Sequence, residues 1–180
     1  MESTREFTIH ELVLDDAVGL CRLMVSNMAR FERFFPNTLR QNLTVKTSQD
    51  FISKKQEQFE ANFEFTWALK EVTSGKLIGL IILKELNWID GVGELAYCID
   101  KNYNGKGWTT QAVKIISRHS LEHFRLNTLQ IVVHKSNTAS LRVAEKCGYI
   151  WKRTLSEAYT PPKEKALDME LYELSQPTLQ

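Results

Sequence analysis

The chain has 180 residues, 43% of them hydrophobic and 25% charged, which suits a single globular domain over residues 1–180 with a buried core. The formal net charge of +1 provides no field that would attract nucleic acid or a membrane surface, so we expect neither as a partner. Cys21, Cys98 and Cys147 are odd in number and scattered, a pattern that excludes a disulfide framework and favours a reducing compartment. The first ten residues are polar and no apolar run is long enough to cross a bilayer, so we expect a cytoplasmic protein.

The first third of the sequence predicts one strand and two helices. Alternation favours a strand over Phe7–Leu12. The pair Asp15–Asp16 is a candidate cap for a helix that reaches Phe34 and is ended by Pro36. A second helix, with phenylalanines on its apolar side, is predicted after Thr47–Ser48.

The middle of the chain predicts three strands joined by short turns. Phe63–Leu69 alternates as a half-buried strand does, and Thr73–Gly75 is a turn. Lys76–Leu86 is a long, nearly continuous apolar strand. The turn Asn87–Gly93 then leads into a strand over Glu94–Asp100. Short connections of this kind predict an antiparallel meander.

The last third changes to a helix and strand alternation. A helix is predicted over Lys106–Phe124, a strand over Leu129–Val133, and a short helix over Asn137–Cys147 that Gly148 ends. Two final strands follow, Tyr149–Leu155 and Leu167–Leu174. The order β-α-α-β-β-β-α-β-α-β-β predicts an α+β fold with a mixed, mostly antiparallel sheet flanked by helices.

The stretch YCIDKNYNGKGWTTQAV places a glycine-containing loop between a strand and a helix. Gly105 and Gly107 lack a Cβ, so a phosphate can approach the backbone at the positive end of the helix dipole. Lys106 adds charge, and the hydroxyls of Thr109 and Thr110 can donate to phosphate oxygens. The stretch matches neither the Walker spacing nor the three-glycine dinucleotide pattern. It therefore predicts a cradle for a pyrophosphate, the alternative being glycines that serve only the geometry of the turn.

Three segments carry a family resemblance that extends from about Phe7 to Leu174. They are GELAYCIDKNYNGKGWTTQAV, HKSNTASLRVAEKCGY and KRTLSEAYTPPKEKALDMELYEL, with Asp168 at a recurrent aspartate position. In this order and spacing they resemble the GNAT (Gcn5-related) N-acetyltransferase superfamily, and within it the Rim-type ribosomal-protein N-terminal acetyltransferases. The resemblance implies the GNAT fold and acetyl-CoA as co-substrate.

The resemblance also implies how the coenzyme is held. The family's Gln/Arg-x-x-Gly-x-Gly/Ala pattern falls on residues 104–109, where Asn104 departs from Gln/Arg and Thr109 departs from the small last residue. The family's strand before this loop splays from its neighbour, which leaves backbone groups near Cys98 and Ile99 for the pantetheine amides. The cofactor-binding residues implied are Cys98, Ile99, Asn104, Gly105, Lys106, Gly107, Trp108, Thr109, Thr110 and Asn137.

Acetyl transfer to an amine needs a base, an acid for the leaving thiolate and a donor to the carbonyl oxygen. Glu94 lies where many relatives place a carboxylate that acts through water, and its alternative is a solvent-facing strand residue. Ala144 stands where many members have an acidic tyrosine, so Ser140, one helical turn earlier, is the candidate acid. The alternative for Ser140 is a helix serine that bonds its own backbone. The N–H near Cys98 is the candidate oxyanion donor.

The segment NMARFERFFPNT matches the region that helps form the acceptor pocket in the Rim-type branch. Arg33, Phe34 and Phe35 are the candidate substrate residues, and a helix end that merely covers the core is the alternative. His119 and His123 lie one helical turn apart without a third ligand, so we expect no metal.

The predicted function is an N-acetyltransferase that moves acetyl from acetyl-CoA to a primary amine, such as a ribosomal-protein N-terminus, in a ternary complex. The alternatives are a small-amine acetyltransferase of the polyamine or aminoglycoside type, and a non-catalytic acyl-CoA-binding sensor. A homodimer that uses the edge of the last two strands is a further prediction.

Overall fold

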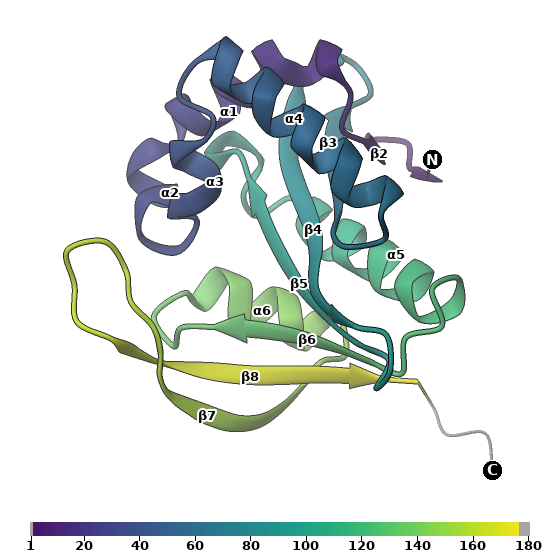
Figure 1. Cartoon of the computed structure of the whole chain (residues 1–180), viewed down its shortest axis with the longest axis vertical. Coiled ribbons are helices and arrows are strands. Elements are labelled where there is room, and N and C mark those ends of the chain that lie inside the picture. Colours follow the sequence, from purple (N-terminus) through teal and green to yellow (C-terminus); the bar gives the residue numbers. More distant parts are fainter. Residues whose placement is uncertain (1, 177–180) are drawn as a thin grey trace. The chain divides into compact units, whose positions relative to one another are not determined.

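The structure, a computed structural model (Figure 1), describes residues 2–176. It divides into two compact units. Unit 1 comprises Met1–Ile82 and Tyr97–Trp108, and unit 2 comprises Leu83–Ala96 and Thr109–Gln180. The strands β4 (Leu77–Asn87) and β5 (Val92–Ile99) run from one unit into the other.

Unit 1 is a sheet with the strand order β1-β2-β3-β4-β5, covered on one face by helices (Figure 1). Strands β2 and β3 pair antiparallel from Phe7↔Glu71 to Glu11↔Trp67. The bounds of the remaining elements are β1 (Glu2–Ser3), β2 (Phe7–Glu11), a 3-10 turn (Leu14–Asp16), α1 (Ala17–Ser26), α2 (Met28–Phe34), α3 (Pro36–Arg40), α4 (Val45–Glu60), β3 (Phe65–Glu71) and a second 3-10 turn (Lys101–Tyr103).

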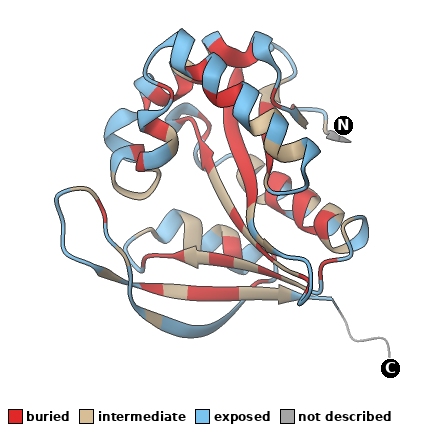
Figure 2. Ribbon diagram, in the orientation of Figure 1, coloured by how far each residue is buried: buried red, intermediate tan, exposed pale blue. Residues whose placement is uncertain are grey.

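The core of unit 1 lies between these helices and the sheet (Figure 2). Apolar side chains of all four helices meet Ala68 on β3, Leu80 on β4 and Cys98 on β5. The first five residues of β3 are all buried, so this strand is covered on both faces. The half-buried strand predicted from Phe63 is therefore wrong in two respects, since Phe63 precedes β3 and is 67% exposed.

The helices of unit 1 differ in their ends from the prediction. The predicted single helix to Phe34 is interrupted at Asn27, whose side-chain amide donates to the carbonyl of Leu23 at 2.9 Å. Pro36 begins α3 as well as following α2, because its fixed φ suits a first helical position. The next helix starts three residues earlier than Ser48, and Thr44 caps it by accepting from Thr47 N–H at 3.1 Å.

Unit 2 contains a parallel strand pair and the closing hairpin. Its strand order is β4-β5-β6-β8-β7. The bounds are α5 (Trp108–Glu122, with Trp108 belonging to unit 1), β6 (Thr128–Val133), α6 (Thr138–Lys146), β7 (Ile150–Tyr159) and β8 (Leu167–Ser175). The hairpin is irregular near Glu157, which has a φ of 48°, and its N–H donates to Asp168 Oδ1 at 2.9 Å. This bond gives the recurrent aspartate a role in holding the hairpin.

The predicted fold class is confirmed: helices flank a mixed, mostly antiparallel sheet in the predicted order. The structure adds the short elements β1, α2 and α3. Within residues 2–176, no helix combines the length and the apolar character that crossing a membrane requires.

Candidate active site

The glycine loop of unit 1 is exposed and has a left-handed backbone at both glycines. Residues 104–107 are all exposed, and Gly105 and Gly107 have φ angles of 78° and 80°. A Cβ placed at either position would meet no atom within 4 Å. The glycines are therefore required by the backbone conformation and leave open space beside it, as a cradle for a ligand needs.

The far end of the loop is held by aromatic rings. The Trp108 ring lies 5.9 Å from that of Phe7 and 5.2 Å from that of Tyr103, measured between centroids. The ammonium of Lys106 lies 4.6 Å from the Tyr103 centroid and 5.0 Å from the Trp108 centroid. This cation–π contact gives Lys106 a packing role, and its predicted contact with phosphate stays a prediction.

The near end of the loop is held by hydrogen bonds from α2, a helix about 70 residues earlier in the sequence. Arg30 on α2 donates from Nη1 to the carbonyl of Ile99 at 3.2 Å and from Nη2 to Asn104 Oδ1 at 3.3 Å. The Asn104 N–H donates to the Lys101 carbonyl at 3.3 Å. Two groups that the resemblance assigns to the coenzyme, the Ile99 carbonyl and the Asn104 N–H, therefore already have protein partners.

A buried carboxylate precedes the loop. Asp100 is 2% exposed, and its Oδ2 pairs with Lys76 Nζ at 2.9 Å while its Oδ1 accepts from Asn102 N–H at 2.9 Å. Burial is the largest single influence and would raise the pKa of Asp100, but the Asn102 N–H and the Lys76 ammonium together outweigh it and lower that pKa. The carboxylate thus stays charged and fixes the turn that carries the loop.

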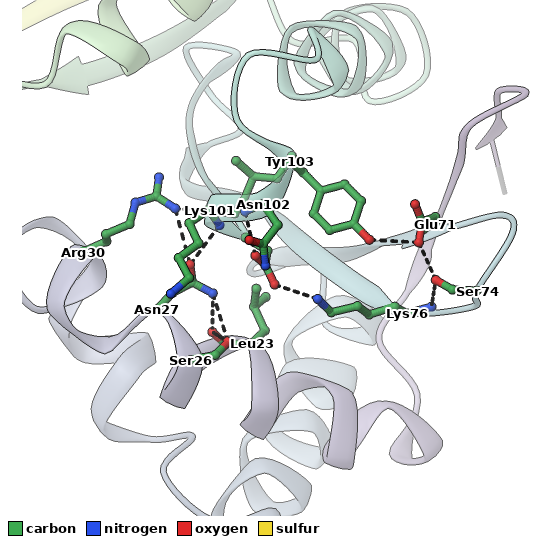
Figure 3. A network of polar contacts seen from close by, with 12 residues as sticks. Leu23, Ser26, Asn27, Arg30, Glu71, Ser74, Lys76, Lys101, Asn102 and Tyr103 are labelled. Carbon is green, nitrogen blue, oxygen red and sulfur yellow. Dashed lines mark hydrogen bonds and ion pairs between the residues drawn. The ribbon is translucent and has the colours of Figure 1, made fainter.

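A second polar pair lies beside it (Figure 3). The Tyr103 hydroxyl donates to Glu71 Oε2 at 2.8 Å. Burial of the phenol and the neighbouring carboxylate raise the pKa of Tyr103 to about 12. Hydrogen bonds from Ser74 and from Tyr103 lower the pKa of Glu71. Tyr103 is therefore a hydrogen-bond donor in the loop support.

Cys98 is a packed strand residue. It is 8% exposed, and burial raises the pKa of its thiol to about 12. A thiol in this state is a poor nucleophile. Its carbonyl oxygen would lie 2.6 Å from a Cβ at Gly79 on β4, so the two strands approach closely here because position 79 has no side chain.

In unit 2, the ladder between β5 and β6 is short. It runs from Val92↔Thr128 to Glu94↔Gln130, although β6 continues to Val133. The part of β5 that follows Glu94 therefore lies outside this ladder. Glu94 itself is 20% exposed at its side chain, and its Oε1 lies 2.8 Å from Lys84 Nζ.

The candidate residues on α6 lie together at the start of that helix, also in unit 2. Asn137 is the N-cap, and its Oδ1 accepts from the N–H of Ser140 at 3.3 Å. Asn137 therefore has a structural role at the helix end in addition to the one that the resemblance implies.

The other candidate positions in unit 2 differ in exposure. Thr109 and Thr110 are half-buried in the first turn of α5. Ala144 on α6 has no exposed surface.

The candidate substrate residues divide between surface and core. The guanidinium carbon of Arg33 lies 4.9 Å from the Phe34 ring centroid, and both side chains are partly exposed. Phe35 packs against the core of unit 1, and its ring lies 6.1 Å from that of Phe31.

Sequence reasoning missed the residues that support the loop. Asn27, Arg30 and Lys76 bond residues between Ile99 and Asn104 from positions 24 to 74 residues away, a separation that no local pattern reveals. Asp100 carried a local signal, since an aspartate two residues before a polar turn residue is typical of an Asx turn. Among the described residues, no three His, Cys, Asp or Glu side chains gather as a metal site would require.

The chain is similar to known proteins in sequence and in fold. Residues 6–150 match the acetyltransferase (GNAT) domain. The probable N-acetyltransferase YjcK of Bacillus subtilis (strain 168) is 28% identical over 144 residues, 78% of this chain and 78% of the relative.

Two solved structures share the fold. The ribosomal-protein-S5-alanine acetyltransferase from Vibrio fischeri gives a TM-score of 0.91 at 16% identity, over 99% of this chain and 98% of that chain. Spermidine N-acetyltransferase from Vibrio cholerae, in complex with CoA and spermine, gives 0.79 at 19% identity, over 96% and 97%. Because the domain match spans well over half of the sequence, the chain belongs to the GNAT family of N-acetyltransferases.

Proposed function

We propose that the chain transfers the acetyl group of acetyl-CoA to the α-amino group of a protein N-terminus, by direct attack in a ternary complex. The observation that carries the proposal is the exposed loop 104–107, which leads into α5 and has two left-handed glycines with open space beside them. Backbone N–H groups at a helix start are a ready site for a diphosphate.

Acetyl-CoA, which supplies the acetyl group as a thioester, fits the residues present. The N–H groups of Gly105 and Gly107 and the first turn of α5 would hold its diphosphate, with the hydroxyls of Thr109 and Thr110 as further donors. The backbone near Cys98 and the side chain of Asn137 remain the proposed contacts for the pantetheine arm. The V. cholerae relative named above was solved with CoA, which supports this choice.

We propose Glu94 as the general base that removes a proton from the amine through a water molecule. Its Oε1 pairs with Lys84 at 2.8 Å, which holds the side chain in place, and Oε2 is the proposed acceptor for the water that takes the amine proton. The amine must lose a proton to attack, so a fixed carboxylate is what the step needs.

The leaving thiolate needs a proton or a hydrogen-bond donor. Position 144 carries only a methyl group and can supply neither. We propose the hydroxyl of Ser140, in the first turn of α6, as this hydrogen-bond donor. Water can protonate the product thiolate afterwards, because a thiol of ordinary pKa leaves readily as the thiolate near neutral pH.

The charges near the candidate acceptor residues favour a peptide over a polyamine. Helix α2 carries the two cations Arg30 and Arg33 against the single carboxylate of Glu32, and the guanidinium carbon of Arg33 lies 4.9 Å from the Phe34 ring centroid. A polycation would be repelled by this segment, whereas one α-amino group followed by a neutral or acidic peptide would not. A small-amine acceptor stays the second candidate, because relatives include a spermidine acetyltransferase.

The test is release of CoA thiol from acetyl-CoA with a panel of N-terminal peptides, spermidine and an aminoglycoside. We expect turnover with one or more peptides and a kcat/KM at least about tenfold lower with spermidine. Turnover confined to small amines would move the assignment to the second candidate. Binding of CoA without turnover on any amine would make the chain a sensor, and absence of CoA binding would reject the proposal.

The role of Glu94 is separable from its ion pair. Glu94→Gln should lower kcat by about 10²–10⁴-fold with little change in CoA affinity, which is the range for loss of a general base. The matched control Lys84→Met removes the partner of the same ion pair and keeps the carboxylate. Equal effects of the two variants would reduce Glu94 to a structural role.

Location and assembly follow as further proposals. Cys21, Cys98 and Cys147 are all free, which supports a reducing compartment such as the cytoplasm. For the homodimer, the candidate surface is the edge strand β7, where Ile150 is 67% and Trp151 52% exposed. Sedimentation equilibrium of the wild type and of a Trp151→Glu variant would test it.

A further inference from the structure

Unit 1 contains a pair of side chains, Asn27 and Arg30, that joins the α1–α2 junction to the segment before the glycine loop (Figure 3). Asn27 Oδ1 accepts from the N–H of Lys101 at 2.9 Å. It also accepts from Arg30 Nη1 at 3.3 Å. Arg30 in turn donates to the Ile99 carbonyl and to Asn104 Oδ1. The two side chains thus bond the backbone at Ile99 and Lys101 and the side chain of Asn104, three residues of one short segment.

Asn27 is itself immobilised. It is 2% exposed, and its Nδ2 donates to the carbonyl of Leu23 at 2.9 Å and to Ser26 Oγ at 3.2 Å. Because both ends of the amide are bonded, its oxygen has a fixed position and direction. Arg30 therefore approaches the loop from an anchored point, although its own side chain lies in an exposed position.

The loop needs such an anchor. Its two glycines have no packing neighbour at the Cβ position, and glycine has more backbone freedom to lose than any other residue. The conformation of the loop must therefore be fixed at its two ends. One end is held by the aromatic contacts of Trp108, and the other by the bond between Asn104 and Arg30. A ligand that binds a preorganised loop does not have to order it, so its affinity rises.

We propose that Asn27 and Arg30 form a clamp that holds residues 99–104 in the conformation that binds acetyl-CoA. Arg30 is then a positioning residue for the coenzyme. The inference rests on the proposed function, since it assigns a role within the same site. It also explains how a chain with asparagine at the first position of the loop pattern keeps that position ordered: a guanidinium from α2 bonds the asparagine side chain.

The geometry of the clamp distinguishes arginine from lysine. A planar guanidinium can donate to Asn27, Ile99 and Asn104 at once, whereas one ammonium on a flexible stem cannot keep three acceptors in this arrangement. Arg30→Lys should therefore resemble Arg30→Ala in the coenzyme affinity. A role based on positive charge alone predicts the opposite, namely a Lys variant that behaves as the wild type.

The experiment is calorimetric titration of CoA into the purified full chain, with the melting temperature of each variant measured in parallel. We expect Arg30→Ala and Arg30→Lys to raise the Kd for CoA about 5–20-fold, the range for loss of one or two charge-assisted hydrogen bonds. In turnover assays the KM for acetyl-CoA should rise by a similar factor, and kcat should change by less than about threefold. Arg40→Ala, which removes an exposed arginine from α3, is the control and should leave the Kd within about twofold.

A double-mutant cycle gives the second readout. Asn104→Ala removes the acceptor at the loop and leaves Arg30 in place, so it serves even where an Arg30 variant folds poorly. The effects of Arg30→Ala and Asn104→Ala on the Kd should be clearly less than additive, because both remove the same bond.

The outcomes separate this inference from the proposed function. If the wild type binds CoA and the Arg30 variants bind it equally well with only a lower melting temperature, the clamp is structural and the inference is overturned. Wild-type affinity in the lysine variant overturns it as well. If the wild type itself does not bind CoA, the proposed function fails and the inference fails with it.

Discussion

Replacement of Asn27 by alanine should destabilise the protein to an extent that the hydrogen bonds of this side chain determine. The mutation removes a donor from the Leu23 carbonyl and an acceptor from the Lys101 N–H, each now bonded at 2.9 Å. The Leu23 bond is buried, and its loss leaves that carbonyl with the longer bond from the Ser26 hydroxyl, at 3.4 Å. A buried group without a partner costs about 1–3 kcal/mol, and a partly exposed one costs about 0.5–1.5 kcal/mol.

Together these terms predict a loss of about 3 kcal/mol in the free energy of unfolding. For a chain of this length, each kcal/mol corresponds to about 2–4 °C, so the melting temperature should fall by about 6–12 °C. Asn27→Asp keeps the acceptor for Lys101 and loses the donor to Leu23, so it should rank between the wild type and Asn27→Ala.

Thermal unfolding followed by circular dichroism, with urea titrations for the free energies, measures both variants. Asn37→Ala, at an exposed position of α3, is the matched control and should change the free energy of unfolding by less than about 0.5 kcal/mol. If Asn27→Ala proved as mild as Asn37→Ala, the argument that this amide satisfies buried backbone groups would be refuted.

Three further predictions concern the strands and the thiols. Gly79→Ala should lower the free energy of unfolding in urea titrations by about 2–4 kcal/mol, because its Cβ would lie 2.6 Å from the backbone oxygen of Cys98. An effect below about 1 kcal/mol would show that β4 and β5 can separate there without cost. The pKa of Asp100 is lowered in the folded state, so its contribution to stability is present above its unfolded pKa of about 3.9 and is lost as the pH falls through the folded value. Acid titrations should therefore show a steeper loss of stability below about pH 4 in the wild type than in Asp100→Asn. Burial raises the pKa of Cys98 to about 12 and that of Cys147 to about 11. A thiol reagent at pH 8 should therefore modify only Cys21 rapidly in the native protein, and all three thiols in guanidinium chloride. Two rapidly reacting thiols in the native protein would contradict this prediction.

The parts of the fold that the sequence predicts well are those whose signals are local. Gly148 ends α6 with a φ of 88°, as a C-terminal glycine does, and the apolar run of β4 gives a strand close to its predicted bounds. The break at Asn27 was missed because an asparagine that bonds the carbonyl four residues earlier looks, in sequence, like any helical residue. The burial of both faces of β3 was missed because burial of Thr66 depends on what packs over it.

The same distinction holds for the candidate site. Gly105 and Gly107 were recognised from residue type and position, and their backbone angles are those that only glycine adopts easily. The sequence does not predict the contacts of Arg30, although Arg30 lies in the segment predicted to help form the acceptor pocket, because its acceptors are 69 and 74 residues away. The roles of Glu94 and Ser140 stay predictions that kinetics must test.

Because of its aromatic contacts, the intrinsic fluorescence of Trp108 can report on ligand binding at the glycine loop. The chain has four tryptophans, and Trp67 is buried whereas Trp88 and Trp151 are about half exposed. Replacing these three by phenylalanine would leave one emitter, whose indole touches Phe7 and Tyr103 and lies beside a lysine ammonium. Its emission wavelength and intensity would then follow any ligand that displaces the ammonium, in real time and without a label.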